Sequence, residues 1–247
     1  MLVGGKMLCD RIEYVGTTHV GNVRDNNEDS YIMKVKPVDG NALFIVADGI
    51  GGGAHGDEAS GMIVEDLDWY FSGDTSIDIE TFKDEVSSIN SKINTYYQNV
   101  KKTGGSTLTG VIVLQDKPFV INVGDSRVYR FRSDNIEQLT WDHTLENFQL
   151  KAGIVGSDTE VKGNGKALVR AMGREERITM DIKPVDLMKE DMLLVCSDGL
   201  YGEMTKEKMK LILDSNMNLV EMKNKMLDEV LSGDAKDNVT FIILKIN

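Results

Sequence analysis

Hydrophobic residues recur at helical spacing in several parts of the chain. The clearest case runs from Phe82 to Val100 in steps of three and four residues, which places the apolar side chains on one face of a helix of about five turns. Residues 56–71 show a similar pattern, and Asp57 and Glu58 at their start suit the positive end of a helix. Shorter helices are predicted at residues 144–152, 205–214 and 218–231.

Short hydrophobic runs separated by turn residues predict β-strands elsewhere. Residues 42–47 are all apolar, which is typical of a strand buried on both faces. Further strands are predicted at residues 30–35, 107–114, 118–123, 126–132, 136–139, 192–196 and 239–246. Because strands and helices come in blocks rather than in strict alternation, the pattern favours an α+β fold in which helices cover an antiparallel sheet or sandwich.

The composition indicates a folded protein without internal division. Of the 247 residues, 41% are hydrophobic and 28% are charged, which is the ordinary range for globular proteins. There are only three prolines, no linker rich in Pro, Ser or Gly, and no internal repeat. We therefore predict one domain that spans residues 1–247.

Charge and cysteine content narrow the possible partners and compartments. With 28 basic and 40 acidic residues the formal charge is −12, which argues against binding to nucleic acid or to an anionic membrane. No signal peptide is visible, and the longest apolar run is too short to cross a bilayer. Two cysteines and three histidines argue against a disulfide framework and a zinc site. We expect a cytoplasmic monomer.

Acidic residues stand at the ends of the predicted strands: Glu28, Asp29, Asp48, Asp125, Asp198 and Asp237. A carboxylate at a strand end is held by a rigid scaffold and still reaches solvent. Several that converge would repel one another without a cation, and hard oxygen ligands favour Mg²⁺ or Mn²⁺ over Zn²⁺. Taken singly, each Asp-Gly pair is explained by a turn, so the metal hypothesis rests on their number. Arg24, four residues before Glu28, adds a guanidinium able to bind a phosphate.

Short motifs around these acids occur in a distinctive order: Gly21-Asn22-Val23-Arg24, Asn27-Glu28-Asp29, Val46-Ala47-Asp48-Gly49, Gly105-Ser106-Thr107, Val123-Gly124-Asp125-Ser126-Arg127, Asp142-His143, Ser197-Asp198-Gly199-Leu200 and Asp237-Asn238-Val239-Thr240. From about residue 12 to the C-terminus, the chain resembles the metal-dependent serine/threonine protein phosphatases of the 2C type in their compact bacterial form. The resemblance implies an α+β fold, with a central sandwich of two antiparallel β-sheets flanked by α-helices on both faces.

The resemblance also implies a centre of two Mn²⁺ or Mg²⁺ ions in a cleft at one edge of the sandwich. Asp48 would bridge the two ions, and Gly49 would contribute its backbone carbonyl. Asp198 and Asp237 would complete the ligands of the other ion. Asp125 matches the residue that helps Asp198 to hold a weaker third ion in bacterial relatives.

The remaining residues carried over by the resemblance concern water and phosphate. Glu28 and Asp29 would hold metal-bound waters, and Arg24 would bind the substrate phosphate. A hydroxide activated between the two ions would hydrolyse phosphoserine or phosphothreonine in proteins. A metal-bound water or His55 would protonate the leaving group, although a surface position at a helix start suits His55 better. The implied partners are phosphorylated proteins, among them a cognate serine/threonine kinase and its substrates.

Three alternatives are weighed against this interpretation. Residues 51–56 match a dinucleotide-binding glycine pattern, but Asp48 beside them would repel phosphates. Cysteine-phosphatase chemistry is excluded because Val15 and Gly202 stand where its arginine would follow each cysteine. A phosphatase fold kept only as a binding module stays open, although every main ligand position is intact. Residues 153–166 are predicted to form a flap that tunes substrate choice.

Overall fold

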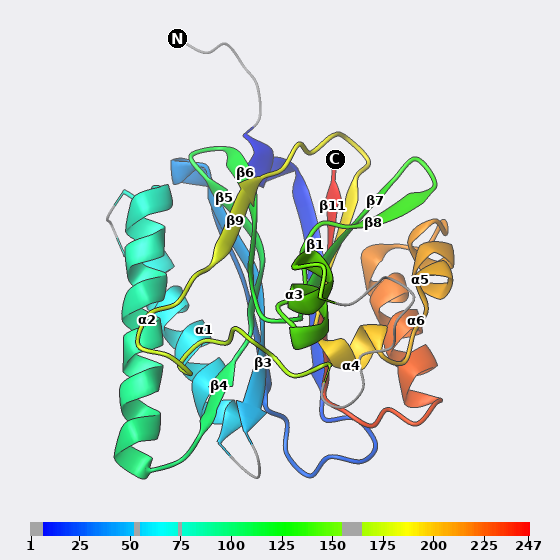
Figure 1. The fold of residues 1–247 in the computed structure, drawn as a ribbon. Helices are drawn as coiled ribbons and strands as arrows, with labels where there is room; N and C mark the ends of the chain where they lie inside the picture. Colours follow the sequence, from blue (N-terminus) through cyan, green and yellow to red (C-terminus); the bar gives the residue numbers. More distant parts are fainter. Residues whose placement is uncertain (1–6, 52–54, 74–75, 155–164) are drawn as a thin grey trace.

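Two antiparallel β-sheets face each other at the centre of the molecule (Figure 1). The computed structural model describes residues 7–51, 55–73, 76–154 and 165–247. The first sheet has the strand order β1 (Ile12–His19), β11 (Val239–Ile246), β10 (Met192–Cys196), β7 (Arg127–Arg132) and β8 (Asn135–Gln138). The second has the order β2 (Asp29–Lys36), β3 (Asn41–Gly51), β5 (Leu108–Leu114), β6 (Lys117–Val123) and β9 (Asp181–Pro184), and β4 (Gly104–Ser106) pairs with the end of β3.

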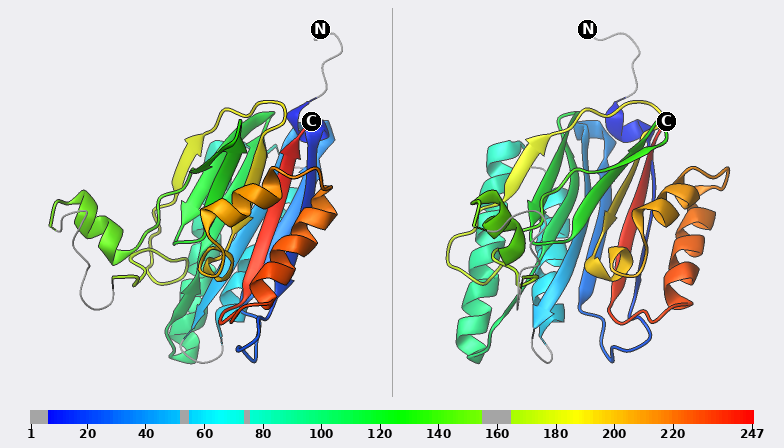
Figure 2. Two further views of the ribbon diagram at one scale, coloured as in Figure 1. Left: turned by 90° about the vertical axis from the view of Figure 1, so that its right-hand side faces the viewer. Right: turned by 45° about the vertical axis from the view of Figure 1, so that its right-hand side comes forward.

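Helices cover the outer face of each sheet, which gives four layers (Figures 1 and 2). Helices α1 (Gly56–Ser72) and α2 (Ile79–Val100) pack on the second sheet. The helices α4 (Asp198–Tyr201), α5 (Lys206–Leu213) and α6 (Leu219–Leu231) pack on the first. Helix α3 (Leu145–Lys151) projects from the body of the molecule, as Figure 2 shows. The predicted α+β sandwich with helices on both faces is confirmed.

The alternation of side chains along β3 explains how the layers are held together. Phe44 and Val46 pack between the two sheets, whereas Leu43 and Ile45 point to the other face and pack against α1 and α2. All four side chains are fully buried. The prediction of a strand buried on both faces is therefore confirmed for this central strand.

Most predicted elements are found, with differences at their ends. Helix α2 begins at Ile79, because the side chain of Asp78 accepts hydrogen bonds from the backbone N–H groups of Glu80 and Thr81. Strands β1, β4 and β9 were not predicted. Strand β9 has four residues and β4 has three, and both owe their extended form to pairing with neighbouring strands.

Strand order brings the acidic strand ends to one end of the sandwich. Strand β2 starts where β3 approaches its end, with Asp29 paired to Asp48, and β11 starts beside the end of β10. In the described part of the chain, no helix combines the length and apolar character that crossing a bilayer would require.

Candidate active site

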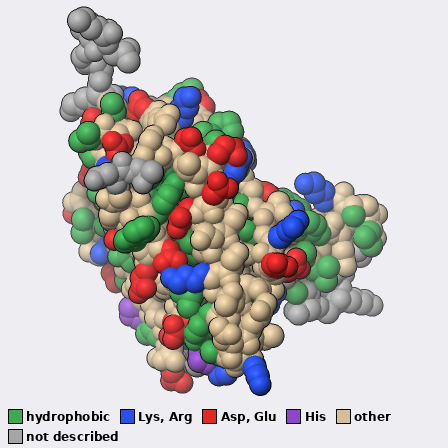
Figure 3. Space-filling view, turned by 90° about the vertical axis from the view of Figure 1, so that its left-hand side faces the viewer, with side chains coloured by type: hydrophobic (Ala, Val, Ile, Leu, Met, Phe, Trp, Pro, Cys, Tyr) green, Lys and Arg blue, Asp and Glu red, His purple; other side chains and the backbone are tan. Residues whose placement is uncertain are grey.

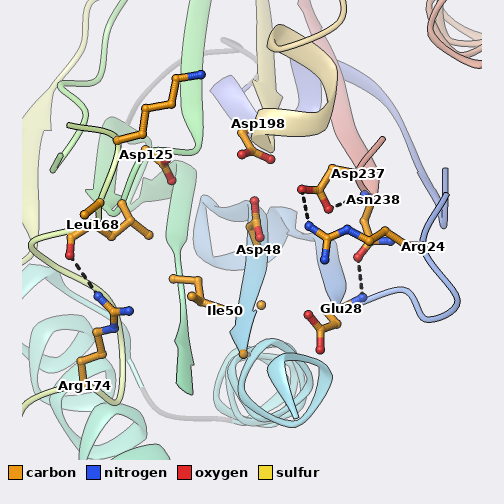
Figure 4. Close-up of a pocket in the computed structure, with 14 residues that line it drawn as sticks. Arg24, Glu28, Asp48, Ile50, Asp125, Leu168, Arg174, Asp198, Asp237 and Asn238 are labelled. Atoms are coloured by element: carbon orange, nitrogen blue, oxygen red, sulfur yellow. Dashed lines mark hydrogen bonds and ion pairs between the residues drawn. The ribbon is translucent and has the colours of Figure 1, made fainter. Parts of the chain in front are cut away.

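A cavity of about 420 Å³ opens at this end of the sandwich. Its acidic lining consists of Glu28, Asp48, Asp125, Asp198 and Asp237 (Figure 4). We call it the acidic cavity. Asp48 lies at its centre, and Arg24 and Arg174 lie on opposite sides of Asp48. The fold thus brings together residues that are up to 214 positions apart, since Arg24 and Asn238 share one lining (238 − 24 = 214).

Asp48 is fixed by its own backbone. Its N–H donates to Oγ1 of Thr107 at 2.9 Å, and its carbonyl accepts from the N–H of Thr107 at 2.9 Å. The Thr107 hydroxyl also contacts Oγ of the buried Ser126 at 2.8 Å. Because these polar groups are buried and paired, the position of Asp48 is rigid.

Gly49 lies where the chain passes between two other backbones. Its N–H donates to the carbonyl of Glu28 at 3.1 Å. A Cβ atom at this position would collide with the carbonyl oxygens of Gly56 and Glu28. Only glycine therefore fits, and its backbone reaches the lining of the acidic cavity.

Asp125 is supported from behind by an aromatic and ionic cluster. The hydroxyl of Tyr201 donates to the carbonyl of Asp125 at 3.0 Å, and the guanidinium of Arg127 stacks 3.6 Å from the centre of the Tyr201 ring. Arg127 in turn pairs with the buried carboxylate of Asp142 at 2.6 Å. This cluster explains why Asp142 belongs to the motif set although it does not line the cavity.

Glu28 and Asp29 are neighbours in sequence but occupy different places. The Glu28 carboxylate lines the acidic cavity and accepts a hydrogen bond of 3.2 Å from the N–H of Gly56, at the start of α1. Asp29 lies behind the cavity, where its carboxylate accepts a hydrogen bond of 2.8 Å from the hydroxyl of Ser197. Glu28 therefore faces the acidic cavity, whereas Asp29 is 7% exposed and lies outside the lining.

Arg24 pairs with one of the predicted metal ligands. Its Nη2 donates to Oδ2 of Asp237 at 2.8 Å, as the dashed line in Figure 4 marks. The Arg24 side chain is about half exposed, and that of Asp237 is 37% exposed. Both groups can therefore turn toward a ligand at little cost in packing.

The carboxyl groups of the site disfavour one another's ionisation. Burial raises the pKa of Asp48 well above its usual range, and the charges of Asp29 and Asp198 add to the effect. Burial likewise raises the pKa of Asp29 to about 7, against the opposing hydrogen bond from Ser197. Burial and the charge of Asp198 raise the pKa of Asp125 to about 7.

The pKa of Asp198 is also raised, although two neighbouring groups oppose the increase. Burial and then the charge of Asp237 raise its pKa, whereas the positive charge of Arg24 and a side-chain hydrogen bond with Asp48 act in the opposite direction. Strand β10 ends at Cys196, as predicted, and Asp198 is the first residue of α4, one residue later. The site therefore holds more negative charge than its neighbouring cations neutralise.

The donor set of the acidic cavity suits a hard divalent cation. Carboxylate oxygens and the Gly49 backbone are the ligands that Mg²⁺ and Mn²⁺ prefer. Within residues 7–51, 55–73, 76–154 and 165–247, no three acidic, histidine or cysteine side chains are close enough to enclose an ion as they stand. Asp237, which would be one of the residues to hold such an ion, is paired with Arg24 through Oδ2.

The three histidines lie outside the acidic lining. His55 contacts the Tyr96 hydroxyl at 3.4 Å and the Lys102 ammonium group at 2.5 Å, which agrees with its interpretation as a residue at the start of α1. His143 is buried, and its Nδ1 accepts from the N–H of Gly124 at 3.0 Å. His19 accepts from the N–H of Gly21 at 3.0 Å, which is a structural role.

Both cysteines are buried, and the predicted flap is described only in part. Cys196 is fully buried, and burial raises the pKa of its thiol, which is consistent with an inert side chain. Cys9 is also buried and free. Of the predicted flap, residues 155–164 lie outside the described residues, as do residues 52–54 of the glycine-rich turn.

Sequence reasoning did not single out two polar residues of the cavity lining, Asn238 and Arg174. Asn238 accepts from the N–H of Glu28 at 2.8 Å and donates to the carbonyl groups of Val20 and Asn26, so it holds the loop that carries Arg24. Asn238 lies within a quoted motif, which was a usable signal. Arg174 lies in a segment without periodicity, and no sequence signal marks it as part of the site, whereas Lys166 is the last residue of the predicted flap.

The solved structures that resemble this chain define its class. The serine/threonine phosphatase Stp1 from Staphylococcus aureus has a TM-score of 0.84 and 26% sequence identity, with 100% of this chain and 98% of that chain covered. MsPP from Mycobacterium smegmatis, a Ser-Thr phosphatase solved in complex with cacodylate, has a TM-score of 0.82 and 26% identity, with 98% and 100% covered. The fold is thus that of bacterial serine/threonine phosphatases.

Sequence comparison supplies the family. The family model for protein phosphatase 2C matches residues 15–232. The serine/threonine phosphatase stp of Listeria welshimeri is 32% identical over 239 residues, which cover 93% of this chain and 94% of the relative. The protein phosphatase PhpP of Streptococcus pneumoniae is 30% identical over 93% of this chain and 96% of the relative. The chain belongs to the protein phosphatase 2C family and is a serine/threonine phosphatase.

This assignment and the strand pairing dispose of the dinucleotide alternative. A dinucleotide fold needs parallel strands linked through a helix, with the glycines between the first strand and that helix. Here β3 pairs only with antiparallel neighbours in the described part of the chain.

Proposed function

We propose that residues 1–247 act as one catalytic domain that hydrolyses phosphoserine and phosphothreonine in proteins with two Mn²⁺ or Mg²⁺ ions in the acidic cavity. The observation that carries the proposal is the convergence of Asp48, Asp125, Asp198 and Asp237 on one cavity from four strand ends. Burial and the neighbouring negative charges raise the pKa values of Asp48, Asp125 and Asp198, so the ionised site is unfavourable and gains stability from added positive charge.

Asp48 and Gly49 are the proposed ligands at the centre of the cavity, and Asp198 and Asp237 are the ligands beside them. Asp125 and Asp198 would hold a third, weaker ion. When bound, the ions would supply Lewis-acid chemistry to the phosphate held by these residues and would make water in the cavity more acidic. The family is expected to depend on metal, and the oxygen-rich lining agrees with that expectation.

The side chains of this chain bind and orient the phosphate and the water. Arg24 is the proposed phosphate ligand, since its exposed guanidinium offers paired N–H donors at the rim. Glu28 is held by the start of α1 so that its free oxygen can accept a hydrogen bond from bound water. Asp29 accepts a hydrogen bond from Ser197 and is paired with Asp48 across β2 and β3. Its proposed role is therefore to position Asp48. The relative MsPP was solved with cacodylate, a tetrahedral oxyanion, which supports a phosphate site in this fold.

The partners and the location follow from the same proposal. The substrates are phosphorylated proteins, and we include a cognate serine/threonine kinase among them. A cytoplasmic location and a monomeric state stay predictions from composition.

The direct test is metal-dependent hydrolysis of p-nitrophenyl phosphate and of a phosphothreonine peptide. We expect turnover with Mn²⁺ at neutral to mildly alkaline pH, and its loss when the metal is chelated. Absence of turnover while calorimetry shows bound Mn²⁺ would favour the alternative of a fold kept as a binding module.

We predict that Arg24→Ala raises KM for phosphopeptides by about tenfold or more, because an interaction between a guanidinium and a phosphate contributes roughly 1.5–3 kcal/mol. Its affinity for inorganic phosphate should fall in parallel, as measured by competitive inhibition. Arg130→Ala is the matched control, since Arg130 pairs with Glu137 on the β7–β8 hairpin. Unchanged phosphate affinity in Arg24→Ala would contradict the assignment.

A further inference from the structure

The acidic cavity carries a second set of cations, away from Arg24. Lys166 and Arg174 line it, and Figure 4 shows Arg174 on the far side of Asp48 from Arg24. Within the part of the chain that the structure describes, neither has a carboxylate partner within 4.0 Å. Figure 3 shows acidic side chains spread over the face that α2 covers, as the net charge of −12 leads one to expect. Two cations without a carboxylate partner among the described residues are an exception to this acidic character.

A second cavity of about 430 Å³ adjoins the acidic cavity, and we call it the flanking cavity. The two cavities share Leu168 and Arg174 in their linings. Phe148 and Ile178 add further apolar surface, and Arg177 adds a cation. A substrate that enters the acidic cavity can therefore continue past Leu168 into a cavity lined by both apolar and basic side chains.

The cations of the flanking cavity are not equally available. Arg170 pairs with Asp181 at 3.0 Å and lies 5.2 Å from the centre of the Phe148 ring. Arg174 donates from Nη1 to the carbonyl of Leu168 at 3.0 Å, which leaves its other N–H groups to face the cavity. Arg177 is exposed and has no ion pair with the described residues, and Glu175 is the one carboxylate in the lining. Arg174 and Arg177 are thus the cations that are free to bind an anion.

The backbone that carries these arginines is fixed although it has no regular secondary structure. The buried Asn90 donates to the carbonyl groups of Glu175 and Glu176, and its Oδ1 accepts from the N–H of Gly173 at 2.7 Å. Asn94 donates to the Gly173 carbonyl at 3.0 Å. Because the segment is held before any ligand arrives, little ordering entropy is lost on binding.

We propose that the flanking cavity binds a second anionic group of the substrate, close in sequence to the phosphorylated residue, with Arg174 and Arg177 as its donors. The inference rests on the proposed function of the acidic cavity and adds a substrate preference to it. The group is a carboxylate or a second phosphate, both of which match the paired N–H donors of a guanidinium.

A neighbouring cavity of about 640 Å³ is a weaker candidate for this role. It is lined by Tyr97, Lys102 and Arg174, and it shares only Arg174 with the acidic cavity. The Lys102 ammonium group already contacts His55. The flanking cavity is therefore the better continuation of the acidic cavity.

The test compares phosphothreonine peptides that differ only in one flanking residue, which is alanine, glutamate or phosphoserine and is moved through the positions around the phosphothreonine. We expect wild-type kcat/KM to be about fivefold higher or more with an anionic residue at the preferred position, mainly through KM. Arg174→Ala and Arg177→Ala should each reduce this ratio by about threefold, and Arg174→Lys should retain part of it.

Lys117→Ala is the matched control, since Lys117 is an exposed cation at the other end of β6 from Asp125. Its ratio should equal that of the wild type. A larger ratio for phosphoserine than for glutamate identifies phosphate as the preferred group, and the reverse identifies carboxylate. Equal rates for anionic and alanine peptides in the wild type, or a preference that survives in both alanine variants, would overturn the proposal.

Loss of phosphatase activity and loss of anion binding in the flanking cavity can be told apart. Hydrolysis of the alanine peptide with Mn²⁺ reports on the acidic cavity alone. If that hydrolysis is absent, fluorescence anisotropy of labelled peptides still measures the flanking cavity, because binding needs no turnover. Tighter binding of the anionic peptides by the wild type than by Arg174→Ala supports the proposal there, and equal binding refutes it.

Discussion

Asp198→Asn is expected to lower kcat/KM for a phosphothreonine peptide by at least about 10³-fold, because it removes a charged ligand of the proposed metal site. Asparagine keeps the size of the side chain but has no negative charge. The backbone of α4, which Asp198 starts, should be retained. The measurement is Mn²⁺-dependent turnover, with kcat and KM determined separately.

The stability of the same variant tests the electrostatic account of the site. Burial and the charge of Asp237 make the ionised form of Asp198 unfavourable, so in the presence of a chelator the variant should be at least as stable as the wild type at pH 8. Added Mn²⁺ should raise its unfolding midpoint less than it raises that of the wild type.

Asp214→Asn is the control for both measurements, since Asp214 is an exposed residue that follows α5. It should keep wild-type turnover and the full response to Mn²⁺. Wild-type turnover in Asp198→Asn, or a marked loss of stability without metal, would contradict the role given to Asp198.

The metal-free protein is expected to lose stability as the pH rises from about 5 to 8. In the folded chain the pKa values of Asp29 and Asp125 are raised to about 7, whereas their ordinary value is 3.8. Between these limits the folded chain binds more protons than the unfolded chain, so the free energy of unfolding falls as pH increases. Each such group contributes a slope of up to about 1.4 kcal/mol per pH unit.

Other buried groups modify this slope without reversing it. Asp48 and Asp198 also have raised pKa values and add to the loss. His143 acts in the opposite direction, because burial lowers its pKa and the folded state therefore favours its neutral form at higher pH. One histidine opposes four aspartates, so the net effect is a loss of stability toward alkaline pH.

Metal should cancel this loss. Because ions compete with protons for the same carboxylates, the stabilisation by Mn²⁺ should be larger at pH 8 than at pH 5. Urea unfolding at both pH values, with chelator and with Mn²⁺, measures the effect. In the presence of a chelator, the free energy of unfolding of Asp48→Asn should depend less steeply on pH than that of the wild type. A metal-free wild type that becomes more stable toward pH 8 would refute the mutual repulsion of these carboxyl groups.

Several features of the fold could be predicted because they are encoded locally. The step of three and four residues from Phe82 to Val100 reports helix α2, since helical periodicity is a property of neighbouring residues. The apolar run of residues 42–47 likewise reports a strand buried on both faces. Strand β9 was missed because its four residues become extended only through pairing with β6.

The amino-acid sequence by itself determined the class of chemistry, because acids at the ends of apolar strands and the order of their motifs are visible along the chain. Only the tertiary structure decided that Arg24 pairs with Asp237, that Asp29 lies behind the lining, and that Arg174 lines three cavities. These relations join segments that are distant in sequence, and such contacts are set by how the two sheets and their connections pack rather than by any local pattern.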